Sequence, residues 1–154
     1  MNISELLNKE YIIADIKSKT KREVLIELSE VFPLKELEID GDAMVNVLLE
    51  REKLGSTGIG GGIAIPHGKL EGLNQLILSF GRSDGGVDYD ALDGKPVNLF
   101  FLLMAPENSA GQHLKALAKI SRILKDDEFK KELIDADSSD AIYSIIEKKD
   151  NQFY

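Results

Sequence analysis

Hydrophobic positions along the chain alternate between strand-like and helix-like spacing. Residues 11–16 are apolar and β-branched, which is typical of a strand, whereas residues 24–32 carry apolar side chains at helical spacing and are followed by Pro33. Residues 76–82 and 97–104 again favour strands. Because nearly every side chain of the 97–104 segment is apolar, we expect this strand to lie at the centre of a sheet.

Polar residues that can cap helices precede several of the helical segments. The pairs Thr20 with Glu23 and Ser109 with Gln112 both fit the capping box, in which two side chains satisfy free backbone donors. The helices interleave with the strands, which predicts an α/β fold with a mixed β-sheet flanked by helices. We expect a frayed tail over residues 150–154. Helix starts are expected near Ser4, Thr20, Asp40 or Asp42, Ser109, Asp127 and Ser138.

A glycine-rich segment, residues 55–62, interrupts this pattern and is predicted to form neither a helix nor a regular strand. Its glycines let main-chain N–H groups approach a ligand closely, so the segment could cradle an anion. From glycine content alone, a long tight turn is the simpler explanation. Pro66 ends the short apolar segment 63–65, so we expect the next residue, His67, at an exposed loop rim. Turns are expected at residues 85–86 and 93–94.

Composition narrows the possible functions. A length of 154 residues suits one domain, residues 1–154, because a second would have too few residues to bury its own core. The formal net charge of -8 argues against broad attraction to nucleic acid. The absence of cysteine excludes disulfides and thiolate metal sites. We see no signal peptide, and the longest apolar stretch is far too short to span a bilayer, so we expect a cytoplasmic protein.

Two nucleotide-binding motifs fail when they are tested against the glycine-rich segment. A P-loop needs Gly, four residues and then Gly-Lys-Ser/Thr, but here Gly68-Lys69 is followed by Leu70, and Ile63 occupies the first glycine position. A dinucleotide fingerprint that starts at Gly58 also ends at Ile63 instead of glycine. A nucleotide-dependent enzyme is therefore weakly supported, and we expect no cofactor.

The chain has two histidines, His67 and His113. A neutral imidazole offers a lone pair that can attack phosphorus near neutral pH, although a lone histidine is more often a bystander than a nucleophile. If Ser109 caps its helix, His113 lies in the first turns, where the positive helix end keeps the ring neutral and attracts an anion. The alternative for His113 is a plain polar residue at a helix edge.

Arg51 lies near a predicted helix end, just before the glycine-rich segment. Its guanidinium could grip phosphoryl oxygens, or it could stabilise the helix C-terminus or pair with Glu50 or Glu52. Lys69 either adds positive potential beside His67 or is solvated surface. With two histidines, no cysteine and no His-Glu-x-x-His spacing, we expect no metal site.

The stretch from Leu49 to Lys69, LEREKLGSTGIGGGIAIPHGK, closely resembles the signature of a known family. The family is the mannitol/fructose class of enzyme IIA domains of the bacterial phosphoenolpyruvate-dependent phosphotransferase system. The resemblance extends over nearly the whole chain, including VDYDALDGKPV at residues 87–97 and HLKAL at residues 113–117. It implies a mixed β-sheet flanked by helices, which agrees with the pattern of hydrophobic positions.

The resemblance also implies roles for individual residues. His67 matches the histidine that is phosphorylated, on Nε2, by a histidine of an HPr-like carrier protein. Arg51 matches the arginine that supports the phosphohistidine, and His113 matches the second histidine that assists transfer. We expect a small, transient partner interface with a partly apolar rim near Ile59 and Ile63. The expected phosphoryl-binding loop, whose N–H groups face the phosphoryl oxygens, consists of Ser56, Thr57, Gly58, Ile59 and Gly60.

Two branches of this family fit the sequence. In the sugar-specific branch, the phosphoryl group passes to a cysteine of an enzyme IIB protein and then to a sugar. In the nitrogen-related branch, the IIA protein ends the relay and regulates partners through its phosphorylation state. We favour the regulatory branch, because the chain carries no attached IIB or membrane IIC part. A module that binds an anion without a covalent bond to His67 is a second alternative, and neither nucleic acid nor a membrane is an expected partner.

Overall fold

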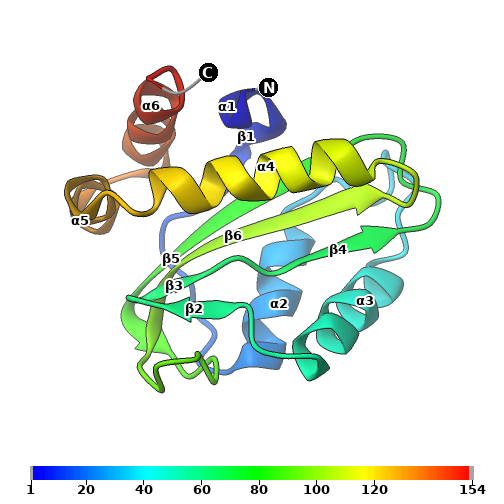
Figure 1. Ribbon diagram of the computed structural model, residues 1–154, viewed down its shortest axis with the longest axis horizontal. Helices are drawn as coiled ribbons and strands as arrows, with labels where there is room; N and C mark the ends of the chain where they lie inside the picture. The colour runs from blue at the N-terminus through cyan, green and yellow to red at the C-terminus, as the bar shows by residue number, and fades with distance from the viewer. Residues whose placement is uncertain (1, 153–154) are drawn as a thin grey trace.

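The computed structural model describes residues 2–152, and within them six strands form one mixed sheet with helices on both sides (Figure 1). This architecture confirms the predicted α/β class. The elements in chain order are α1 (Ile3–Leu6), β1 (Leu7–Ile13), α2 (Lys21–Glu30), α3 (Gly41–Lys53), β2 (Gly58–Gly60), β3 (Ile63–Ala64), β4 (His67–Leu70), β5 (Ile77–Val87), β6 (Val97–Pro106), α4 (Ala110–Ile123), α5 (Asp127–Asp135) and α6 (Ser139–Asp150).

The strands are ordered β1-β5-β6-β3-β2, and β4 pairs with β6 beyond the end of β3. Strands β5 and β6 are antiparallel, as are β2 and β3, whereas β1 is parallel to β5 and both β3 and β4 are parallel to β6. The apolar segment predicted to be central is β6, which pairs with strands on both of its edges. One edge of β6 pairs with β3 and then with β4, the strand that carries His67.

Each face of β6 packs against a different layer of helices, which explains why almost every residue of this strand is apolar. Leu99, Phe101 and Leu103 pack with the apolar residues of α1, α4, α5 and α6. The alternate side chains Phe100, Leu102 and Met104 pack with those of α2 and α3. Within residues 2–152, none of the helices combines the length and the apolar character needed to cross a bilayer.

Most of the predicted helix starts are confirmed, and their caps are visible. The Thr20 hydroxyl accepts a hydrogen bond from the Glu23 N–H, but the Glu23 carboxylate accepts from that hydroxyl, so only half of the expected capping box forms. The Asp40 carboxylate accepts from two backbone N–H groups of α3, and the Ser138 hydroxyl caps α6 in the same way. The second predicted capping box, at Ser109, is wrong and is described with the site.

Both ends of the described chain differ from the sequence prediction. Ser4 lies inside α1 rather than capping it, and its N–H and hydroxyl both donate to the Asp150 carboxylate, at 2.9 and 3.0 Å. Asp150 is fully buried at the end of α6, so the expected frayed tail is wrong at its first residue. The predicted tail residues Phe153 and Tyr154 lie outside the described residues.

Three strand boundaries also differ, each because pairing with a neighbour overrides local pattern. Strand β1 begins at Leu7 rather than residue 11, since Leu7 pairs with Leu78 of β5. The glycines at 85–86, predicted as a turn, lie within β5 at an irregularity of its pairing with β6. Gly58–Gly60 forms the short strand β2, also with irregular pairing, where the sequence predicted none. The turn at residues 93–94 is confirmed.

Candidate functional site

His67 is the first residue of β4 rather than a residue of an exposed loop rim. Pro66 interrupts the edge of the sheet without ending it, because the Pro66 carbonyl accepts a hydrogen bond from the Leu103 N–H at 2.9 Å and β4 then pairs with β6. In Figure 1, β4 runs between α4 above and α3 below. His67 is paired with Leu103, which faces α4, and its half-buried ring lies on that side of the sheet.

The neighbouring residue, Gly68, explains how closely α3 can approach this strand. A Cβ atom at Gly68 would lie 2.7 Å from Cγ1 of Val47 in α3 and 3.6 Å from Cε of Met104. Successive residues of a strand point to opposite faces, so Gly68 faces α3 while His67 faces α4. The His-Gly pair thus lets helices pack on both faces of the edge strand that carries His67.

The His67 ring is held by its own backbone. Nδ1 lies 2.7 Å from the carbonyl oxygen of Ile65. A carbonyl oxygen only accepts, so this contact assigns the ring hydrogen to Nδ1 in the neutral form. The lone pair of the neutral ring is then on Nε2. The geometry therefore selects the nitrogen that is available as a nucleophile.

His113 contacts His67 from the first turns of α4. The two ring centroids are 5.6 Å apart and the ring planes meet at 72°, so the rings pack edge to face. The side chain is only 6% exposed, and its Nε2 atom is buried with no hydrogen-bond partner among residues 2–152. Buried polar atoms without partners are rare in folded proteins, and each calls for an explanation such as a catalytic role or a bound water or ion. The two histidines that the family resemblance assigns to the same transfer step therefore lie in contact.

The helix that carries His113 begins without the predicted cap. Ser109 is the N-cap residue, but its hydroxyl donates to the Pro106 carbonyl at 2.8 Å and accepts no hydrogen bond from the helix. Its backbone turns with φ -119° and ψ 39°, unlike the extended caps of α2 and α3. Since Pro106 is the last residue of β6, this hydrogen bond fixes the corner between β6 and α4 and sets where His113 meets the sheet.

Both histidines are biased toward the neutral form. Burial lowers the pKa of His67, the hydrogen bond with the Ile65 carbonyl opposes this, and the positive charge of Arg51 lowers it further. Burial also lowers the pKa of His113, helped by the charge of Lys69 and, whenever the His67 ring is protonated, by that of His67. Near pH 7 the site therefore holds two uncharged imidazoles, one of which keeps a free lone pair at Nε2.

Arg51 lies in the last turn of α3, where its Nη1 atom donates to the Gly55 carbonyl at 2.8 Å. This contact is the helix-stabilising one that the sequence left open as an alternative. The charge of Arg51 nevertheless acts on the pKa of His67, so the guanidinium lies within electrostatic reach of that ring. Arg51 thus anchors the start of the glycine-rich segment and places positive potential near the histidines.

The expected phosphoryl-binding loop is more constrained than its glycines suggested. The Thr57 N–H donates to the Glu52 carboxylate at 3.0 Å, and the Gly58 N–H donates to the Ser56 hydroxyl at 3.0 Å. Those two donors are already used within the protein, and a phosphoryl-binding role for the loop stays a prediction. Ile59 is 49% exposed beside them, and Gly60 has φ +98°, which favours glycine.

Sequence reasoning missed the role of Glu52, which lies next to Arg51 in α3. Its side chain is buried, and it binds Thr57, Tyr89 and Lys21. One acidic residue in a helix rich in charges gives no periodic signal, because its burial depends on which face of α3 meets the sheet. Within residues 2–152 no cluster of three or more His, Cys, Asp or Glu side chains is placed to hold a metal ion.

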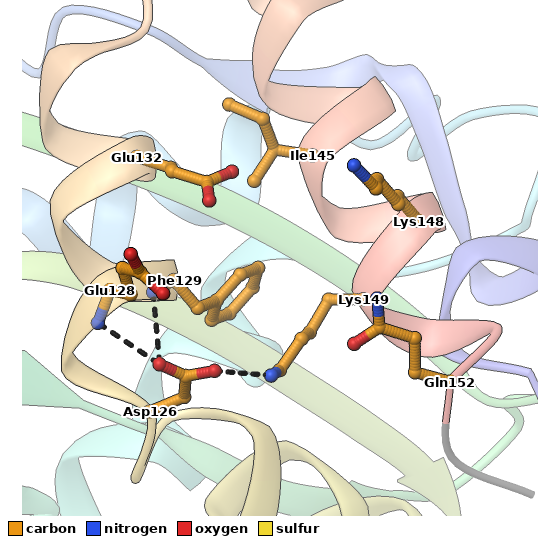
Figure 2. A pocket seen from close by; sticks show the side chains of 8 residues that line it. All are labelled: Asp126, Glu128, Phe129, Glu132, Ile145, Lys148, Lys149 and Gln152. Atoms are coloured by element: carbon orange, nitrogen blue, oxygen red, sulfur yellow. Dashed lines mark hydrogen bonds and ion pairs between the residues drawn. The ribbon is translucent and has the colours of Figure 1, made fainter.

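A small pocket lies elsewhere, between α5 and α6 (Figure 2). The Asp126 carboxylate accepts there from the N–H groups of Glu128 and Phe129 and pairs with Lys149. Lys149 also lies over the Phe129 ring, 5.9 Å from its centroid. These groups cap α5 and join it to α6. Because α5 follows the C-terminal end of α4 and His113 lies near the other end, this pocket is separate from the histidines.

Comparisons with known proteins agree with this fold. Residues 5–149 match the family model of the phosphoenolpyruvate-dependent sugar phosphotransferase system, EIIA 2. The crystal structure of nitrogen regulatory protein IIA-Ntr from Neisseria meningitidis superimposes with a TM-score of 0.87 at 35% identity, over 94% of this chain and 98% of that one.

Two curated relatives point toward different branches. A nitrogen regulatory protein of Bradyrhizobium diazoefficiens is 43% identical over 149 residues, which is 95% of each chain. The fructose-specific EIIABC component of Bacillus subtilis is also 43% identical, over 97% of this chain and 24% of that longer protein. The fold is that of the IIA proteins of the phosphotransferase system. The chain belongs to the EIIA 2 family of that system, as its resemblance in sequence indicated.

Proposed function

We propose that this protein is a phosphohistidine carrier of the cytoplasm that accepts a phosphoryl group on Nε2 of His67 from an HPr-like protein. We further propose that it acts as a regulatory, nitrogen-related enzyme IIA. The observation that carries the first part is the hydrogen bond between Nδ1 of His67 and the Ile65 carbonyl, because it leaves Nε2 as the free nucleophile. The full-length similarity to a nitrogen regulatory protein supports the second part.

The proposed reaction is an in-line transfer between two histidines. The Nε2 lone pair of His67 attacks the phosphorus of the donor's phosphohistidine and forms a new N–P bond. The donor's N–P bond breaks, and its electron pair returns to the donor imidazole, so no metal or further reagent is needed. Docking of the two proteins supplies most of the rate, because it aligns donor and acceptor.

Two further residues stabilise the transferred group in this proposal. His113 donates a hydrogen bond to a phosphoryl oxygen from its buried Nε2–H, which has no partner among residues 2–152. Arg51 supplies positive charge that offsets the negative charge of the phosphoryl group. Both effects grow when a docked partner excludes water from the site.

The partner surface that we propose consists of four exposed apolar side chains around the site. Leu92 is next to β2, because its N–H donates to the Gly58 carbonyl, and Leu114 follows His113 in α4. The predicted rim was partly wrong, since Ile63 is only 4% exposed and belongs to the core. The members of this surface are Leu54, Ile59, Leu92 and Leu114, which are 85%, 49%, 72% and 67% exposed.

The test is incubation with phosphoenolpyruvate, enzyme I and an HPr-like carrier. We expect an acid-labile, base-stable phosphoryl label on the wild-type protein, on Nε2 by NMR of the labelled ring, and none on His67→Ala. A protein that binds an anion without a covalent bond would give no label in either form, and that outcome would reject the carrier function in favour of the anion-binding module.

The second candidate function is a sugar-specific enzyme IIA, which the similarity to the fructose-specific relative favours. Such a protein passes its phosphoryl group to a cysteine of an enzyme IIB protein. Affinity capture with phosphorylated and unphosphorylated protein separates the branches. A regulatory protein as the state-dependent partner supports our proposal, whereas rapid loss of the label to an enzyme IIB cysteine supports sugar uptake.

A further inference from the structure

A buried carboxylate, that of Glu52, joins three parts of the fold behind the glycine-rich segment. Its Oε1 atom accepts from the Thr57 N–H at 3.0 Å and lies 3.0 Å from Nζ of Lys21. Its Oε2 atom accepts from the Thr57 hydroxyl and, at 3.1 Å, from the hydroxyl of the fully buried Tyr89. The Glu52 side chain is only 4% exposed, so all its acceptor capacity is directed at the protein.

These bonds continue through the backbone to the His67 ring. Glu52 holds both the N–H and the hydroxyl of Thr57, and the Thr57 carbonyl accepts from the Ile65 N–H at 3.0 Å. The carbonyl of the same residue, Ile65, then lies 2.7 Å from Nδ1 of His67. One side chain is therefore connected to the imidazole by two intervening residues, each of which is fixed on both sides.

The surroundings of Glu52 distinguish it from an ordinary structural ion pair. Lys21, Thr57 and Tyr89 all satisfy the Glu52 carboxylate. Of these three, Thr57 is also the residue whose carbonyl accepts from the Ile65 N–H. The negative charge also acts directly on the ring, since Glu52 raises the pKa of His67 while Arg51 lowers it. Glu52 and Arg51 thus oppose each other in their effect on the same imidazole.

We propose that the Glu52 carboxylate is a positioning residue for His67. Through Thr57 and Ile65, it holds the His67 ring in the tautomer and orientation that leave Nε2 free. This inference deepens the proposed function and rests on it wherever phosphoryl transfer is measured. The positioning itself is a property of the free protein and is measured without any phosphoryl donor.

The first experiment is NMR of the full chain labelled with ¹⁵N at histidine. With two histidines in the sequence, the rings of His67 and His113 give two separate sets of signals. We expect the neutral His67 of the wild type to carry its hydrogen on Nδ1. In Glu52→Ala we expect a mixture of both tautomers at His67, because the Ile65 carbonyl is no longer fixed.

The second experiment measures the rate at which an HPr-like carrier phosphorylates the same variants. Glu52→Ala should slow this step roughly tenfold to a hundredfold, because small misplacements of a reacting atom have effects of that size. Glu52→Gln keeps an acceptor for the Thr57 N–H but loses the charge, so we expect an intermediate rate and a lower His67 pKa. The matched control is Glu50→Ala, since Glu50 is exposed on the same helix and pairs only with Lys53 in the described structure.

A folded Glu52→Ala with the wild-type tautomer and rate would overturn the proposal. If Glu52→Ala does not fold, Glu52→Gln decides, and an unchanged His67 pKa together with an unchanged rate would reject the role of the carboxylate. A wild-type protein that is never phosphorylated would instead reject the proposed function. In that case the tautomer comparison would still confirm or reject the positioning role.

Discussion

At the scale of single residues, the site depends on how burial and hydrogen bonding control two imidazole rings. Burial makes the neutral form of each ring favourable, and the Ile65 carbonyl then determines which nitrogen of His67 keeps its lone pair. His113 contributes a buried ring nitrogen without a partner in the described residues. The charge state of these rings and the free nitrogen of His67 therefore depend on the environment of the residues as much as on their identity.

The first prediction concerns pH. Because the folded protein lowers the pKa of both histidines below 6.5, the unfolded chain binds protons more readily as the pH falls through 6.5. The free energy of unfolding should therefore decrease as pH falls from 6.5 toward the folded pKa values. Thermal melts across this range test it, with NMR titration of His67 as the direct measurement. A His67 pKa at or above 6.5 would contradict the prediction.

The second prediction concerns His113→Ala. The variant should stay folded, and transfer to and from His67 should slow by about a hundredfold, the effect of removing one donor to a developing charge. Single-turnover labelling with the HPr-like carrier measures this rate, and circular dichroism controls for folding. Wild-type exchange rates would reduce His113 to a packing residue.

The third prediction concerns Arg51→Ala, which removes both the bond to Gly55 and the positive charge near His67. We expect slower labelling, by roughly tenfold or more, a shorter lifetime of the phosphohistidine and a higher His67 pKa. Arg51→Lys serves as the control that keeps the charge without the planar guanidinium. A normal phosphohistidine lifetime and transfer rate in Arg51→Ala would reject this role.

At the scale of secondary structure, the edge strand β4 places the site. Both sides of the Pro66 break pair with β6, so His67 has a fixed position beside α4 while α3 packs against the opposite face. A separate contact, made by Arg82 of β5, joins the sheet to α5. Its guanidinium donates to carbonyl groups at the C-terminal end of α5, including that of Leu133 at 3.0 Å.

The fourth prediction tests the contact between β4 and α3. Gly68→Ala adds a methyl group 2.7 Å from Cγ1 of Val47, so it should destabilise the protein by about 1–3 kcal/mol and slow labelling of His67. Gly111→Ala is the matched control, since a Cβ atom there meets open space within α4 and should stabilise by about 0.4–1 kcal/mol. Urea unfolding of both variants measures the difference. Equal stabilities of the two variants would contradict the prediction and show that α3 can move away from β4 at little cost.

At the scale of the whole molecule, a buried ion pair ties the two ends of the described chain to α4. Asp150 is fully buried, accepts two hydrogen bonds from Ser4 and lies 2.6 Å from Nζ of Lys119. Burial acts to raise the pKa of Asp150, but the hydrogen bonds from Lys119 and from the backbone and hydroxyl of α1 outweigh it. The net pKa therefore lies below 3.8.

The fifth prediction concerns this ion pair. Asp150→Ala leaves the Lys119 charge buried without this partner and should destabilise the protein by about 3–5 kcal/mol. Glu50→Ala, which breaks an exposed pair, should change stability by no more than ~0.5 kcal/mol. Because the Asp150 pKa is lowered on folding, its contribution is present above pH 3.8 and is lost as pH falls through the folded value. Denaturant melts at pH 7 test the difference.

Much of the fold could be predicted from local pattern, because that pattern has a direct physical cause. The apolar run that became β6 required burial on two faces, and the helices after Thr20 and Asp40 began at residues able to cap them. Boundaries failed where long-range pairing decided them, as at Leu7, which is a strand residue only because β5 lies beside it. The prediction of a frayed tail at Asp150 failed for the same reason, since the partners of this residue, Ser4 and Lys119, are distant in sequence.

The features of the candidate site likewise separate into those that local sequence specifies and those that depend on long-range contacts. The sequence by itself determined that two histidines and an arginine lie in a family signature, because residue type and spacing are properties of the chain. Only the tertiary structure decided which ring nitrogen of His67 is left free, the burial of Glu52 and the use of the Thr57 and Gly58 N–H groups within the protein. Those features depend on distances between separate elements, which no local pattern of residues specifies.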